Sequence, residues 1–430
     1  MKKMVSVGVI GCGTVGQGVV KILSRMSASI ERRVGIPVRI VAMCDVRPIF
    51  YKGIHCTTSY QELLKNEGID IVVELIGGYE PARTVILSAL RSGKHVVTAN
   101  KAVLAKYWDE VFTLAQEKGK LVYFEAAVGG AIPVVQTIDE GMAGNHIKKI
   151  TGILNGTTNY ILSEMTRSGI PFKEALSLAR FAGFAEANPV FDVDGIDTAH
   201  KLAILSSLAW SQWVKISDIE VTGIGNVSDD DVYFAKKEFG YVIKLLGSAS
   251  VVSNKLELSV EPCMVPNTST FATVEREYNA VMINGDASGD ITLFGKGAGQ
   301  MPAASAVVSD IIYLARQVAY GNAGQMPYIV YDAKKRMPIV PAEKKAGKYY
   351  LRFIAQDRPG VLSRIAGILS ADKISIASVY QKEPLPRLQK GVPVLMLTHA
   401  TTKKNLLRAL KRIDRMPIIL EKTAFYRIES

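Results

Sequence analysis

The sequence VSVGVIGCGTVGQG, residues 5 to 18, decides the fold of the first part of the chain. The apolar run from Val5 to Ile10 is typical of a strand, and a helical pattern follows the glycines. Gly11, Gly13 and Gly16 therefore form G-x-G-x-x-G between a strand and a helix. Such glycines let the backbone turn tightly, approach a pyrophosphate and pack helix against strand. This placement favours dinucleotide binding over a purely structural turn.

The start of that helix is the expected phosphate site, because its free amides and partial positive charge attract anions. We expect the residues that bind the dinucleotide there to be Gly11, Gly13, Thr14, Val15 and Gly16. A second strand, Val38 to Met43, leads to Asp45 and Arg47. An acid there bonds the ribose hydroxyls of NAD, whereas an arginine binds the extra phosphate of NADP. The sequence offers both, so NAD and NADP remain open.

Strands and helices continue to alternate through the first 134 residues. Ile69 to Ile76 and Leu121 to Glu125 are predicted strands, and a strand with a helix before it lies between them. This alternation predicts an α/β fold with a Rossmann-type, doubly wound parallel sheet. Asn100 and Lys101 fall at the carboxyl end of a strand, where ligands bind. Lys101 is thus expected to face cofactor and substrate; the alternative is a helix-start lysine in solvent.

The alternation lapses after residue 134, and we interpret residues 135–300 as an inserted α+β substrate-binding, catalytic and dimerisation domain. Near its end, a glycine-rich loop contains Gly297 and Gly299, and a helix opens at Pro302. Glycines before a helix start expose amides to an anion or a cofactor edge. The helix is expected to return to the nucleotide-binding domain and complete it with residues 300–336.

The stretch GFAEANPVFDVDGIDTAHKL, residues 183 to 202, concentrates the acidic residues of the middle domain. Asp197 and Lys201 stand four residues apart at the start of a helical pattern, so they share one face. The preceding loop, with Glu186, Asp192 and Asp194, is expected to have an irregular, non-helical backbone. A lysine beside carboxylates suits proton transfer to a small polar substrate. The alternative is an acidic loop that caps an ordinary helix.

The 430-residue composition excludes several classes of protein. No window approaches 18 consecutive apolar residues, so no membrane span is expected. The four cysteines show no C-x-x-C spacing and the five histidines are scattered, which fits a reducing cytoplasm and disfavours zinc. The net charge of +12 is concentrated after residue 340, where 18 Lys or Arg stand against 7 Asp or Glu. These basic residues are dispersed, so a solvated face is favoured over nucleic-acid binding.

The last segment is a small domain of its own. Residues 338–348, with two prolines and a charge cluster, are interpreted as a linker. Residues 348–430 then show the order strand, helix, strand, strand, helix, strand, which predicts a ferredoxin-like βαββαβ fold. This segment carries no catalytic cluster.

Over nearly its whole length the sequence resembles homoserine dehydrogenase. The matching segments, in order, are GCGTVGQG, TANKAVLA, FEAAVGGAIP, GILNGTTNYIL, GFAEANPVFDVDGIDTAHKLAILSSLAW and GKGAGQMPAASAVVSD. Ala303 stands where the family commonly has threonine, and little effect on chemistry is expected. The C-terminal DRPGVLSRIAGIL is similar to an ACT regulatory domain.

The resemblance implies NAD(P)-dependent reduction of aspartate semialdehyde to homoserine, in threonine and methionine biosynthesis. It places the catalytic lysine at Lys201, with Asp197 and Lys101 beside it. Substrate ligands would be Glu186, Asp192 or Asp194, Asp197, Lys101 and Gly183, and further cofactor contacts Asn100, Lys101, Gly183, Gly297 and Gly299. A Na⁺ or K⁺ ion would bind Glu125, Val128, Gly130 and Ile132. A homodimer or homotetramer is expected, with threonine as the candidate effector of the ACT domain.

Two other classes of function remain as alternatives. A nucleotide fold with an ACT-like module would also suit a sensor of amino acids, although a sensor has no need of Lys201 and Lys101 together. A semialdehyde dehydrogenase that forms a thioester needs a nucleophilic cysteine. Cys12 lies in the phosphate loop and Cys263 follows a proline, so neither has that environment.

Overall fold

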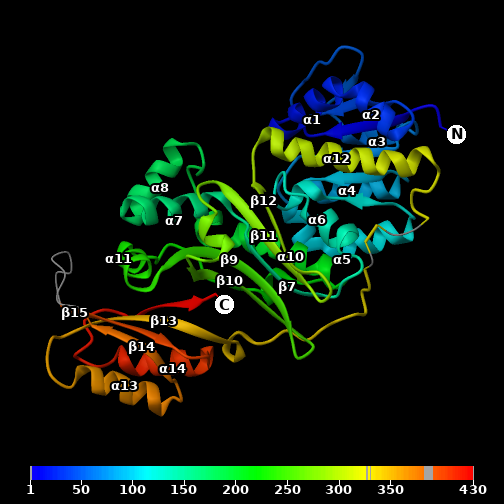
Figure 1. The fold of residues 1–430 in the computed structure, drawn as a ribbon. Helices are drawn as coiled ribbons and strands as arrows, with labels where there is room; N and C mark the ends of the chain where they lie inside the picture. The colour runs from blue at the N-terminus through cyan, green and yellow to red at the C-terminus, as the bar shows by residue number, and fades with distance from the viewer. Residues whose placement is uncertain (1, 326–327, 330, 382–390, 430) are drawn as a thin grey trace. The chain divides into compact units, whose positions relative to one another are not determined.

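The computed structural model describes residues 2–325, 328–329, 331–381 and 391–429 (Figure 1). It divides into two compact units. The first comprises residues 1–156, 197–219 and 277–337, and the second comprises residues 157–196, 220–276 and 338–430. The segment between residues 135 and 300 is thus shared by both units.

The first unit contains the predicted parallel sheet. Its strand order is β3-β2-β1-β4-β5-β6 and every pairing is parallel, which confirms the doubly wound arrangement. The strands are β1 (Val5–Ile10), β2 (Val38–Cys44), β3 (His55–Thr57), β4 (Ile71–Glu74), β5 (His95–Thr98) and β6 (Val122–Tyr123). The last is shorter than expected, because the chain turns into a 3₁₀ helix at Glu125–Ala127.

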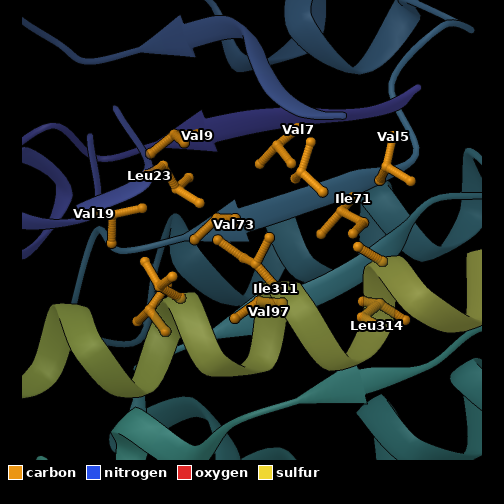
Figure 2. Close-up of a cluster of buried hydrophobic side chains, with 14 of the residues drawn as sticks. Val5, Val7, Val9, Val19, Leu23, Ile71, Val73, Val97, Ile311 and Leu314 are labelled. Atoms are coloured by element: carbon orange, nitrogen blue, oxygen red, sulfur yellow. The ribbon is translucent and has the colours of Figure 1, made fainter. Parts of the chain in front are cut away.

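Helices cover both faces of this sheet. They are α1 (Thr14–Arg25), α2 (Ser27–Val34), α3 (Tyr60–Lys65), α4 (Ala82–Arg91), α5 (Lys101–Glu117) and α12 (Gln300–Ala319). Figure 2 shows Ile311 and Leu314 of α12 facing Val7, Ile71 and Val73 of the strands, all within one buried cluster. Burying each such side chain contributes about 1.5–3 kcal/mol. A helix from late in the sequence therefore belongs to the core built by its beginning.

The same unit holds three antiparallel strands in the order β12-β11-β7. Its strands are β7 (Ile147–Ile153), β11 (Tyr278–Gly285) and β12 (Gly289–Lys296). The unit also contains the one-turn helix α6 (Val134–Gln136) and most of α10 (Ile196–Ala209).

The second unit is built on a sheet in the order β9-β10-β17-β13-β15-β14. Its strands are β8 (Glu220–Val221), β9 (Tyr241–Val252), β10 (Lys255–Pro266), β13 (Ala346–Ala355), β14 (Ile376–Gln381), β15 (Val392–Thr398), β16 (Thr401–Thr402) and β17 (Ala424–Ile428). The predicted C-terminal βαββαβ order is confirmed, with β16 as a short addition. Because β17 pairs with β10, the C-terminal strands continue the β9–β10 hairpin.

The helices of the second unit are α7 (Gly156–Ser168), α8 (Phe172–Phe181), α9 (Val190–Val193), α11 (Asp229–Phe234), α13 (Val361–Ala371) and α14 (Lys403–Ile413). One expectation was wrong here. The acidic loop contains one helical turn, α9, which Pro189 opens by accepting the amides of Asp192 and Val193. The predicted linker lies between α12 and β13 and contacts β10, since the amide of Leu256 donates to the carbonyl of Pro338 and the amide of Val340 donates to the carbonyl of Leu256. Among the described residues, every helix is too short or too polar to span a membrane.

Candidate active site

Asp197 and two lysines form a buried ion-pair cluster in the first unit. Asp197, at the start of α10, is 2% exposed, and its Oδ2 lies 2.7 Å from Nζ of Lys201, one turn later. Its other oxygen, Oδ1, pairs with Nζ of Lys101, the first residue of α5. Each carboxylate oxygen thus holds one ammonium group, and a chain of charge Lys101–Asp197–Lys201 results.

The surroundings of Asp197 keep it ionised. Burial opposes the charged form, but Lys201 and Lys101 outweigh burial and hold the pKa of Asp197 well below its usual range. Asn155 adds a hydrogen bond from Nδ2 to Oδ2 at 2.9 Å. The carboxylate therefore stays negative at every pH at which the protein would work.

The two lysines have different environments. Lys201 is 9% exposed at its side chain and donates to the carbonyl of Leu154 at 2.6 Å. Lys101 is 37% exposed at its side chain. Asn100 caps α5 by accepting the amide of Val103, and its Nδ2 donates to the carbonyl of Gly78. Asn100 therefore orients the start of the helix that carries Lys101.

Sequence reasoning assigned no role to Leu154 or Asn155, although both lie in the segment GILNGTTNYIL that carries part of the family resemblance. The strand β7 ends at Ile153, so the next carbonyl and side chain point where α10 passes.

The phosphate loop is shaped for close approach. Gly11 has φ +96°, and a Cβ there would lie 2.6 Å from the backbone of Leu75. A Cβ on Gly16 would lie 2.4 Å from the carbonyl of Gly11. Gly13, by contrast, faces open space, which leaves room for a pyrophosphate at the start of α1, where Thr14 and Val15 begin the helix. The residues present therefore fit a dinucleotide.

Asp45 lies beside this loop. Its Oδ2 accepts the amide of Cys12 at 2.8 Å, and its Oδ1 accepts the amide of Arg47 at 3.1 Å. Burial works against ionisation, but these bonds outweigh it and lower the pKa of Asp45. The Arg47 side chain is 77% exposed, and its Nε lies 3.5 Å from Oδ1 of Asp45. Both the acceptor for ribose hydroxyls and the donor for a phosphate are present.

The second glycine-rich loop meets the first. Gln300, at the start of α12, donates from Nε2 to the carbonyl of Thr14 at 2.9 Å. Gly299 precedes it with φ +122°. Gly297 lies against the backbone of Gly130, since a Cβ added to Gly130 would lie 2.5 Å from the carbonyl carbon of Gly297. The segments predicted for cofactor and cation are thus neighbours.

Glu125, the predicted cation ligand, lies almost fully buried. Its carboxylate accepts the amides of Val135 at 2.8 Å and Gln136 at 2.9 Å, so it caps α6. Burial raises the pKa of Glu125 to about 7. Its own amide donates to Oδ2 of Asp310, a fully buried residue whose Oδ1 has no hydrogen-bond partner among the described residues.

The predicted carbonyl ligands follow Glu125 in the sequence. The carbonyl of Ile132 accepts the amide of Val134, while Val128 and Gly130 lie in the same buried turn. A desolvated carboxylate and an orphaned carboxyl oxygen suit a hard cation, which favours oxygen ligands. Within the described residues, no group of three or more His, Cys, Asp or Glu forms a metal centre.

The remaining predicted substrate ligands belong to the second unit. Asp192 Oδ2 accepts a bond from the Thr157 hydroxyl at 3.2 Å, whereas Glu186 and Asp194 are exposed. Gly183 has φ +77° just after α8, and its amide bonds the carbonyl of Arg180. Gly183 therefore ends that helix, a structural role that its sequence motif did not indicate.

Three family models match the chain. Residues 11–125 match the homoserine dehydrogenase NAD-binding domain, residues 133–312 match homoserine dehydrogenase, and residues 349–415 match the ACT domain. Together they cover most of the sequence.

Whole proteins agree with these models. The homoserine dehydrogenase of Helicobacter pylori is 40% identical, with 100% of each chain covered, and that of Neisseria gonorrhoeae is 38% identical, with 100% of this chain and 99% of the relative covered. A solved homoserine dehydrogenase from Thiobacillus denitrificans has a TM-score of 0.94 at 40% identity, covering 100% of this chain and 99% of that one.

Proposed function

This chain belongs to the homoserine dehydrogenase family, and on that premise we propose that it interconverts L-aspartate 4-semialdehyde and L-homoserine with NAD or NADP. The observation that carries the proposal is the buried chain of charge Lys101–Asp197–Lys201. Reduction of an aldehyde produces an alkoxide that needs a proton and a positive environment. Two lysines on one carboxylate supply both.

Lys201 acts as the general acid and base. As an ammonium it gives a proton to the alkoxide oxygen, and as an amine it takes the hydroxyl proton of homoserine in the reverse direction. Asp197 and the carbonyl of Leu154 orient its Nζ. Bound NAD(P) would supply the hydride chemistry. Lys101, the more exposed lysine, stabilises the developing negative charge.

Substrate and ion are assigned to the other predicted groups. Glu186 and Asp192 bind the ammonium group of the substrate, and Asp194 is the alternative to Asp192. A Na⁺ or K⁺ ion binds at Glu125 with the carbonyls of the same turn. The nucleotide is bound by residues 1–134 with residues 300–336, and the ACT domain binds an amino-acid effector, with threonine as the candidate. The subunits form a homodimer or a homotetramer.

Initial rates of NAD and NADP reduction with L-homoserine test the proposal. Lys201→Ala should lower turnover by about two orders of magnitude or more while leaving cofactor binding intact. Lys118→Ala, at the exposed end of the helix that carries Lys101, is the matched control and should keep normal turnover. A folded protein that binds cofactor but does not turn over homoserine would favour the amino-acid sensor.

A further inference from the structure

A cavity of about 360 Å³ lies inside the second unit, apart from the cluster of Asp197. One wall is the loop between β8 and α11, which contributes Thr222 and Asn226. The opposite wall is formed by β10, β13, β17 and the first residue of α14. It therefore sits where the C-terminal βαββαβ strands join the β9–β10 hairpin, through the pairing of β17 with β10.

The cavity carries both signs of charge. Four cations, Arg352, Lys403, Lys422 and Arg427, and the carboxylate of Glu261 line it. The partly buried cations have acidic partners around the cavity: Lys403 lies 2.5 Å from Glu220, Arg352 2.6 Å from Asp231, and Arg427 3.1 Å from Glu257. A ligand with a single charge would upset this balance, whereas a zwitterion would preserve it.

Glu261 is the group that a cationic ligand would reach. Its carboxylate lies 3.8 Å from Lys403 Nζ and 3.8 Å from Arg427 Nη1, and both separations exceed hydrogen-bond length. The residue is only 9% exposed. A largely buried carboxylate whose cationic partners lie beyond hydrogen-bond length gains free energy from a closer donor.

The remaining lining suits a small side chain. Thr222 and Asn226 offer polar groups, while Val227, Pro262 and Phe425 provide apolar surface. The volume is at the lower end for ligand pockets, which excludes a dinucleotide and leaves room for a single small metabolite.

We propose that this cavity binds one small α-amino acid, with its ammonium group on Glu261 and its carboxylate on the side of Lys403 and Lys422. The inference rests on the proposed role of the ACT domain as an effector module and gives that role a location. Such a ligand would bridge the β8–α11 loop and the C-terminal strands. Arg352 lies in the same wall and donates a hydrogen bond to Asp231 of α11, so binding of the amino acid would affect the position of that helix.

Titration calorimetry of the full chain with L-threonine, L-methionine, L-isoleucine and L-lysine tests the site. We expect one of them to bind once per chain. Lys422→Gln and Glu261→Gln should each weaken that binding by about tenfold or more, as the loss of one charge-assisted bond implies. Lys422 is exposed, so its replacement leaves folding intact. Lys411→Gln, an exposed lysine of α14 outside the cavity, is the control and should bind normally.

Binding that survives both substitutions would place the effector elsewhere and overturn the inference, as would the absence of binding by all four amino acids. Homoserine turnover is measured separately, without added effector. Homoserine turnover without amino-acid binding would reject only the proposed effector cavity. Amino-acid binding without homoserine turnover would reject only the proposed dehydrogenase activity.

Discussion

Oδ2 of Asp197 lies 2.7 Å from Nζ of Lys201, while the other oxygen of the same carboxylate pairs with Lys101. The two lysines come from different helices, α10 and α5, and one buried acid joins them. Two ammonium groups that both lie within ion-pair distance of one carboxylate would repel each other if that carboxylate were absent. Asp197 is therefore required for both lysines to be charged in one site.

Replacing Asp197 by Asn tests this dependence. Asn keeps the size and can still accept the bond from Asn155, but it removes the charge that holds Lys101 and Lys201. We expect kcat to fall by about a hundredfold, because general acid–base and electrostatic contributions are both reduced. The pH–rate profile should also change shape while the KM for the nucleotide stays close to normal. A variant with a normal profile and normal kcat would separate Asp197 from the chemistry.

The local parts of this site could be predicted from the sequence, and the distant parts could not. The pair Asp197–Lys201 follows from helical periodicity, and the glycine turn after Val5–Ile10 follows from residue type. The contact of Asp197 with Lys101, and the bond from Asn155, depend on how α10 packs against the end of β7, which spacing does not encode.

Two further features of the fold were not indicated by the sequence patterns. The turn α9 forms because Pro189 can begin a helix, a role that its loop-like composition concealed. The segment after Pro338 pairs with Leu256, a contact between residues far apart in sequence. Prediction was therefore reliable where hydrophobic periodicity decided the element, and it missed a short proline-initiated turn and a contact between distant residues.

Arg47 should determine the preference for the phosphorylated cofactor. Its guanidinium is exposed beside Asp45, so it can bind a 2′-phosphate without breaking a buried pair. Arg47→Ala is expected to lower kcat/KM for NADP by about tenfold and to change that for NAD much less. Parallel initial rates with both cofactors measure the ratio. Arg39→Ala, on the adjacent strand β2, is the control. Equal losses with NAD and NADP would contradict the assignment.

Activation by K⁺ or Na⁺ should depend on pH through Glu125. Burial raises the pKa of this residue to about 7, so its carboxylate is largely protonated in acid and ionised in base. A protonated carboxyl is a poor cation ligand. The apparent affinity for K⁺ should therefore rise as pH increases through about 7, and turnover in buffers without alkali cations would measure it.

Asp139 provides the control for that titration, because burial raises its pKa to about 6 and it lies near the same site in sequence. Asp139→Asn should keep the pH dependence of K⁺ activation. If the affinity for K⁺ is flat across this range in the unmodified protein, Glu125 is not a ligand whose ionisation controls the ion.

The pair of Asp231 and Arg352 should stabilise the second unit far more than an exposed pair does. Asp231 is fully buried and accepts bonds from Arg352 Nε at 2.6 Å and from the Tyr426 hydroxyl at 3.0 Å. Arg352→Met leaves the buried carboxylate of Asp231 without its cationic partner. The free energy of unfolding should therefore fall by about 3–5 kcal/mol. Hydrogen exchange of α11 and β13 should show a loss of protection of that size.

Arg412→Met is the matched control in the same unit. Arg412 pairs with Asp372 at 3.1 Å, but half of its side chain is exposed, so water screens the pair. Loss of the Arg412–Asp372 pair should lower the free energy of unfolding by about 0–1 kcal/mol, because exposed ion pairs contribute little. The double variant Asp231→Leu with Arg352→Met should recover part of the lost protection, since it removes both buried charges together. Equal effects of the two single arginine substitutions would show that burial does not govern these pairs.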